Sequence, residues 1–152
     1  MKQYIEATPD SGKEFYRNFH QKGRIVMLNL LRYRQIADYS ISEELRPKKQ
    51  LSGKQAYRRY LDHTLPLLEA AGSRIIFYGS SRSFLIGPDD EKWDDVLLVE
   101  HESVAKFMEF ANSKEYLNYA GHRTAALEDS RLLPMIKSNF VDTLEKAVNL
   151  SV

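Results

Sequence analysis

The sequence of 152 residues contains no cysteine, no long apolar run and no excess of charge of either sign. Without cysteine, disulfides, zinc–thiolate sites and cysteine nucleophiles are excluded. The 22 basic and 21 acidic side chains give a net charge of +1, which offers no electrostatic attraction for nucleic acid or an anionic membrane. No apolar run would span a bilayer, and the N-terminal MKQYIEATPD lacks the apolar core of a signal peptide. We therefore expect a cytoplasmic protein that binds neither nucleic acid nor membrane.

Motifs of metal and cofactor chemistry are also missing. The histidines show no ligand spacing such as H-x-H or H-E-x-x-H, which argues against a histidine-based metal site. There is no glycine-rich phosphate loop and no G-x-S-x-G nucleophile turn. We therefore expect neither a cofactor nor a metal. The length suits a single domain over residues 1–152, with its core at about 25–136.

The most informative segment is IVMLNLLRYR, residues 25–34. Successive side chains of a strand point to opposite faces, so a strand with one wet face alternates apolar and polar residues. Here both faces are apolar, with Met27 in one phase and Leu28 in the other, and Asn29 alone interrupts the run. Helices in a chain of this size cover one face of a sheet. The second face therefore predicts a second copy of the protein, packed through either the Met27 or the Leu28 phase.

The pattern of the whole chain predicts strand, helix, strand, strand, helix, strand, with an added helix at each end. The expected strands are 25–34, 74–79 resumed at 83–86, 93–101 and 131–136. The expected helices are 10–21 capped by Ser11 and Glu14, 52–71 capped by Ser52 and Gln55, 103–111, 113–128, and a last helix from Ser138. This order is typical of the ferredoxin-like βαββαβ unit, an α+β fold with helices on one face of an antiparallel sheet. Two sheets packed face to face would form a dimeric α+β barrel.

The connection from Gln35 to Leu51 is longer than an ordinary connector. It is either a functional flap near a cavity mouth or a mobile insertion, and the sequence favours neither.

Four blocks resemble a known family: MLNLLRYR at 27–34, AYRRYLDHTLPLLEAAG at 56–72, WDDVLLVEH at 93–101 and SKEYLNYAGHRTAALEDSRLLP at 113–134. They are similar to the family of domain of unknown function 1330, in the dimeric α+β barrel superfamily. The resemblance runs from about residue 25 to 136 and implies that fold. The family brings no established activity, and its superfamily includes cofactor-free monooxygenases, isomerase-like enzymes and ligand-binding stress proteins. The Asn-Leu pair Asn29–Leu30 of this chain is part of the resemblance to the family.

Asn29 and Arg123 are the polar residues that interrupt apolar patterns. A buried amide without partners costs about 1–3 kcal/mol, so Asn29 should meet a ligand or a neighbouring backbone group. Arg123 falls in an apolar helical stripe formed by Tyr116, Ala120, Arg123 and Leu127. It is either a bidentate anchor for a carboxylate or enolate, or a structural residue that reaches solvent or pairs with Asp129, Glu128 or Glu100.

His63 and Tyr60 are the candidates for proton transfer, because a histidine at the edge of a helical stripe can act as a general base. A lone histidine in such a position is more often simply packed and hydrogen-bonded. Arg32 and Trp93 are further candidates for substrate binding, although large aromatics in strands usually belong to the core. Asp94 and Asp95 are adjacent on a strand and face opposite ways, which favours a simple strand entry over a carboxylate pair.

Three functions remain open. The first is a metal-free enzyme, monooxygenase- or isomerase-like, acting on a small organic acid or aromatic compound held by Asn29 and Arg123. The second is a non-catalytic ligand-binding or stress-related dimer with the same pocket. In the third, every polar exception is an interface contact of the homodimer.

Overall fold

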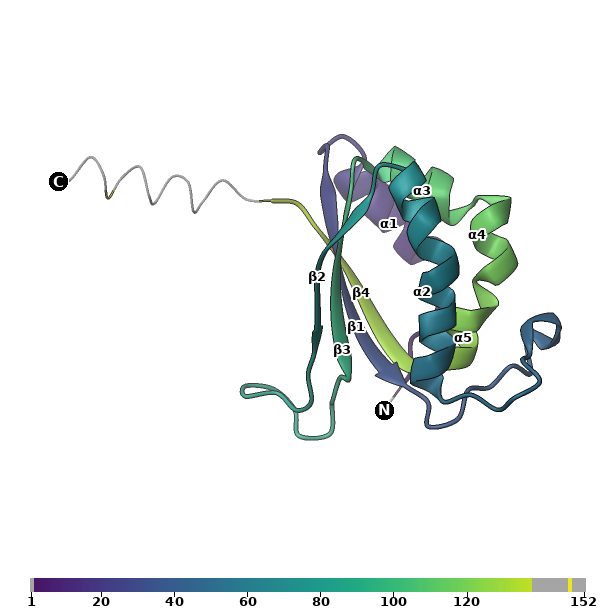
Figure 1. The fold of residues 1–152 in the computed structure, drawn as a ribbon. Helices are drawn as coiled ribbons and strands as arrows, with labels where there is room; N and C mark the ends of the chain where they lie inside the picture. The colour runs from purple at the N-terminus through teal and green to yellow at the C-terminus, as the bar shows by residue number, and fades with distance from the viewer. Residues whose placement is uncertain (1, 138–147, 149–152) are drawn as a thin grey trace.

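A single antiparallel sheet carries all the helices on one of its faces (Figure 1). The computed structural model describes residues 2–137 and Val148. The strand order is β2-β3-β1-β4, which confirms the ferredoxin-like α+β fold. In chain order the elements are α1 (Pro9–Phe19), β1 (Ile25–Tyr33), the 3-10 helix η1 (Glu43–Leu45), α2 (Gly53–Ala70), β2 (Arg74–Ser80), β3 (Asp95–His101), α3 (Val104–Ala111), α4 (Lys114–Tyr119), α5 (Gly121–Ala126) and β4 (Leu127–Met135).

Strand β1 lies inside the sheet and is apolar on both faces, as its sequence predicts. Ile25, Met27 and Leu31 are buried against the helices. The opposite phase forms the second face, where Leu28 pairs with Leu98 of β3 and Leu133 of β4. Leu98 in turn pairs with Phe77 of β2, so one apolar row crosses all four strands. No helix of the described residues covers this face, which we call the bare face; it is the Leu28 phase (Figure 1).

The sequence predicts the N-terminal cap of α2 correctly and that of α1 incorrectly. Helix α2 begins with the expected capping box of Ser52 and Gln55, continues through Pro66, and is followed by Gly72 at a φ of +75°. For α1 the predicted pairing of Ser11 with Glu14 is wrong. The N-cap is Thr8, and Ser11 is its capping-box partner, because Pro9 already occupies the first helical position.

The segment after Ser113 is not one helix to residue 128, as the apolar stripe predicted. It breaks at Gly121 into α4 and α5, where glycine has low helix propensity. Strand β4 then begins at Leu127, because that residue pairs with Tyr33. The stripe of Tyr116, Ala120, Arg123 and Leu127 therefore does not lie on one helix.

Residues 83–86 do not resume a strand. Only an isolated bridge from Ser83 to Lys92 remains, and Phe84, Leu85 and Ile86 are exposed at the tip of the connection between β2 and β3. Beyond that bridge, residues 84–86 have no partner strand within the described part of the chain.

The long connection after β1 packs on the helices. Its backbone is bonded to α5, from Arg34 N to Ala126 O and from Asp38 N to Ala125 O, both at 2.9 Å. The Tyr39 side chain is buried in the core beneath α2 and α5. The connection is thus anchored along its first part, and its movement on ligand binding stays a prediction. The helix predicted from Ser138 lies outside the described residues, and no helix within them is long and apolar enough to cross a membrane.

Candidate functional site

Two tyrosine hydroxyls meet between the sheet and the helix layer. Tyr60 of α2 and Tyr116 of α4 are hydrogen-bonded at 2.9 Å, and their rings lie edge to face. Burial, together with the neighbouring Tyr116 and Tyr57, raises the pKa of Tyr60 well above its usual value, and the charge of Arg123 opposes that rise. Tyr60 therefore keeps its proton at neutral pH and can donate it in a hydrogen bond. It is not suited to act as a base.

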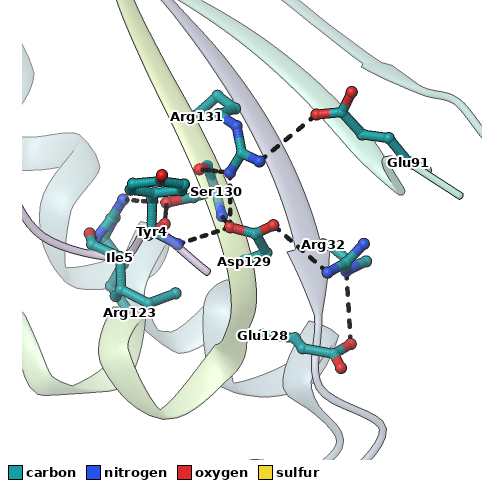
Figure 2. A network of polar contacts seen from close by, with 9 residues as sticks. All are labelled: Tyr4, Ile5, Arg32, Glu91, Arg123, Glu128, Asp129, Ser130 and Arg131. Atoms are coloured by element: carbon teal, nitrogen blue, oxygen red, sulfur yellow. Dashed lines mark hydrogen bonds and ion pairs between the residues drawn. The ribbon is translucent and has the colours of Figure 1, made fainter. Parts of the chain in front are cut away.

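Arg123 of α5 lies near enough to Tyr57 and Tyr60 for its charge to act on their pKa, and its guanidinium is bonded to the N-terminal segment and to β4. One guanidinium nitrogen donates to the backbone carbonyl of Ile5 at 2.7 Å, and the other to the Ser130 hydroxyl at 3.4 Å (Figure 2). Within the described residues of one chain, Arg123 pairs with none of the three acids that the sequence offers as alternatives. Glu128 pairs with Arg32, Asp129 with Arg32 and Arg131, and Glu100 with Arg24 and Arg74. Since a guanidinium carries five N–H donors, Arg123 retains donors for a further acceptor.

Asn29 lies on the helix-facing side of β1, in phase with Met27 and Leu31. Its amide donates to two backbone carbonyls, that of Leu97 at 3.3 Å and that of Met27 at 3.4 Å. Both distances are long for N–H···O bonds, so the amide is only weakly satisfied. Its neighbour in register on β4 is Leu132, whose side chain is 47% exposed on the same face. Solvent therefore reaches the sheet beside Asn29.

His63 does not join this interior group. It is exposed on α2 and stacks on the Tyr119 ring, with centroids 3.9 Å apart and planes within 5°. The His122 ring follows in the same stack at 5.8 Å. Tyr60 and His63 thus go to different partners, and the structure does not bring them together as a proton-transfer pair.

His122 of α5 is a buried histidine. Its Nδ1 shares a 2.7 Å hydrogen bond with the hydroxyl of Tyr39. Burial, with the nearby charges of His63 and Arg59, lowers the pKa of His122. The pair fastens the long connection to α5.

Arg32 and Trp93 belong to a separate polar network around Asp129 (Figure 2). The fully buried Asp129 accepts from the Tyr4 backbone N–H at 2.8 Å and from Arg131 at 2.7 Å, and Arg32 approaches it at 3.4 Å. Burial raises the pKa of Asp129, but these hydrogen bonds outweigh it and lower the pKa overall. Both arginines lie over the buried Trp93 ring. Both arginines are paired with acids, whereas Arg32 Nε and the indole N–H of Trp93 are buried without a hydrogen-bond partner among the described residues.

Asp95 is the residue that sequence reasoning missed. Its carboxylate is buried and accepts from the hydroxyls of Tyr33 and Tyr78, each at 2.6 Å, and from that of Ser80 at 3.0 Å. Burial raises the pKa of Asp95, yet the three hydroxyl donors outweigh it and lower the pKa. The pKa of Tyr33 is raised, first by burial and then by its hydrogen bond to Asp95. A signal existed, because Asp95 shares the buried strand phase of Leu97 and Val99.

Two surface hollows lie elsewhere. One, of about 730 Å³, is lined by α1 and Met108, and the other, of about 210 Å³, lies between α2 and α3. Neither is lined by a predicted site residue. Within residues 2–137, no group of three or more histidine or acidic side chains is arranged to hold a metal ion.

Comparisons with known proteins identify the chain by family. The RPA0582 protein of unknown function from Rhodopseudomonas palustris is 34% identical; the match covers 90% of this chain and 100% of that one, with a TM-score of 0.78. A second crystal structure, of the methylated RPA0582 protein, is 35% identical over 91% and 97% of the two chains, with a TM-score of 0.80. No protein of the curated set matches significantly. Residues 47–134 match the domain of unknown function DUF1330, and the chain belongs to that family.

Proposed function

We propose that this protein is a homodimer that binds a small organic acid with aromatic character between its sheet and its helices. The observation that carries the proposal is the group formed by Tyr60, Tyr116 and Arg123, with Asn29 on the sheet below. The hydroxyl pair and the Asn29 amide have hydrogen-bonding capacity that their partners in the protein use only in part.

The chemistry of this group suits an anion. Arg123 supplies a permanent charge and spare donors, and a guanidinium binds a carboxylate in bidentate fashion. The hydrogen-bonded hydroxyls of Tyr60 and Tyr116 supply one further donor for an oxygen of the ligand. The rings of Tyr57 and Tyr60, 5.2 Å apart, offer an aromatic surface. The weakly bonded amide of Asn29 would hold the polar end of the ligand.

The homodimer is inferred from the bare face. An apolar row across the sheet, from Phe77 through Leu98 and Leu28 to Leu133, favours association with a second copy. At one end of this face, the charged network of Arg32, Asp129 and Arg131 would fix the register of the two sheets. Together the two copies would form a dimeric α+β barrel.

A second candidate is a metal-free enzyme, isomerase- or monooxygenase-like, acting at the same site. It is favoured by the tyrosine pair and by the charge of Arg123 acting on Tyr60, because hydrogen-bond donors and a positive charge stabilise an enolate oxygen. In that reaction Tyr60 would donate a hydrogen bond, since its raised pKa keeps it protonated. His63 has no part in it.

Thermal unfolding with a panel of small acids tests the proposal. Benzoate, 4-hydroxybenzoate, salicylate and aliphatic hydroxy acids would be added to the protein at neutral pH. We expect an aromatic acid to raise the melting temperature, while its methyl ester does not. If calorimetry detects no binding of any of these acids at millimolar concentration, the binding proposal is wrong. Exchange of the α-proton of a hydroxy acid from this panel with deuterated solvent, followed by NMR, would favour the enzyme over the binder.

A further inference from the structure

The connection between β2 and β3 carries the most exposed apolar side chains of the described residues. Leu85 is 100% exposed and Ile86 92%, and Phe84 beside them is 41% exposed. We call residues 81–92 the arm. Single exposed apolar residues are ordinary on protein surfaces, but three in succession at a tip mark an interaction site.

The arm has a defined shape. At its base Ser81 N donates to Asp94 O at 2.8 Å, and Trp93 N donates to Arg82 O at 3.0 Å. At the tip, a Cβ on Gly87 would lie 2.6 Å from the Phe84 ring, so only glycine lets the ring fold against the turn. The arm therefore presents Leu85 and Ile86 in a fixed position.

The direction of the arm indicates its partner. It extends beyond the end of the sheet and turns to the side away from the helices, which is the side of the bare face (Figure 1). Two sheets that pack face to face lie about 10 Å apart. An arm on that side would reach past the gap and lie against the second protomer.

We propose that Leu85 and Ile86 of each protomer pack on the partner protomer, so that the two copies exchange arms. This inference rests on the homodimer proposed above. The symmetry of a two-fold dimer makes the exchange reciprocal, so the contact of an arm with the other protomer occurs twice in one interface. An anionic membrane is a poorer partner, since Asp89, Asp90 and Glu91 follow the tip and would be repelled by it.

The first experiment compares a double variant, Leu85→Asp with Ile86→Asp, with a matched control, Ile41→Asp. Ile41 is 82% exposed on the long connection, beside the helices. All three side chains are free of contacts that fold the protomer, and circular dichroism would confirm the fold. We expect sedimentation velocity to show a dimer dissociation constant at least tenfold higher for the double variant, and an unchanged constant for the control.

The second experiment locates the tip. Because the chain has no cysteine, Leu85→Cys can be labelled at one site with a benzophenone maleimide. Photolysis of mixed ¹⁴N and ¹⁵N protein separates contacts within a chain from contacts between chains. We expect cross-linked peptides of mixed isotope. Cross-links confined to one chain would overturn the inference.

Failure of the arm can be told from failure of the dimer. Leu133→Asp changes the bare face itself and should also weaken the dimer. If Leu133→Asp dissociates the dimer and the arm variant does not, the arm inference is wrong and the homodimer stands. If the native protein is a monomer at micromolar concentration, both are wrong.

Discussion

The hydroxyl groups of Tyr60 and Tyr116 lie 2.9 Å apart and join α2 to α4 within the molecule. A hydroxyl pair of this kind satisfies only part of its hydrogen-bonding capacity, because each oxygen has two lone pairs and one hydrogen. The remaining capacity lies next to the charge of Arg123, which acts on the pKa of both Tyr57 and Tyr60. The predictions below test what this group and its neighbours do.

Arg123→Met should abolish the stabilisation of the protein by an aromatic acid. Charge-assisted hydrogen bonds are worth about 1.5–3 kcal/mol each, so affinity should fall roughly ten- to hundredfold. Stability should also fall by about 1–2 kcal/mol, because the bond to Ile5 is lost. Calorimetry and urea unfolding measure the two effects. Arg123→Lys should restore stability better than affinity, since an ammonium lacks the planar fork. The control is His63→Ala, which lies outside this group and should bind the acid like the native protein. If Arg123→Met also binds the acid with unchanged affinity, Arg123 is purely structural.

Asn29→Leu should leave the fold intact and weaken ligand binding. The amide makes only two long bonds to backbone carbonyls, so its loss should change the free energy of unfolding by less than about 1 kcal/mol. Urea unfolding and ligand titration separate the two outcomes. A large loss of stability with unaltered binding would show that Asn29 serves the sheet alone.

Asp95→Asn should destabilise the protein by about 2–3 kcal/mol, because an amide group replaces a carboxylate that three hydroxyls hold. The measurement is urea unfolding at pH 7. Tyr78→Phe removes one donor at a partly exposed side chain and should cost about 1 kcal/mol or less. If Asp95→Asn costs no more than Tyr78→Phe, the carboxylate is not a structural hub, and its cluster would have to be considered for binding.

The stability of the protein should fall as the pH drops from 7.5 to 5. Burial lowers the pKa of His101 to about 4 in the folded protein, whereas an unfolded histidine titrates near pH 6.5. The unfolded chain therefore binds more protons in this range, and the free energy of unfolding should decrease by about 2 kcal/mol. Above pH 6.5 the contribution is fully present.

Urea unfolding at several pH values measures the slope. His101→Gln should flatten it, whatever its effect on stability at pH 7. The exposed His20, replaced by glutamine, is the control and should leave the slope unchanged. An equal slope in native protein and His101→Gln would assign the pH dependence to other groups, of which His122 is the first, since its pKa is also lowered.

The fold was predictable because its signals are local. The two-faced pattern of β1 and the capping box of Ser52 and Gln55 each depend on residues close in sequence. The pairing that ends α5 at Leu127 depends on Tyr33, nearly a hundred positions away, so the helical stripe misplaced Arg123. Burial of Asp95 was readable from its strand phase, but its donors Tyr33 and Tyr78 come from two other strands. Partners of this kind are set by packing, which no local pattern encodes.

The N-terminal segment before α1 is held to the rest of the chain through its backbone. The amide of Tyr4 donates to Asp129, the carbonyl of Tyr4 accepts from Ser130, and the carbonyl of Ile5 accepts from Arg123. Every residue type except proline offers the same amide and carbonyl groups. Substitutions at positions 4 and 5 should therefore preserve these bonds, whereas removal of a single residue would shift all of them out of register. This segment should therefore tolerate substitutions better than deletions.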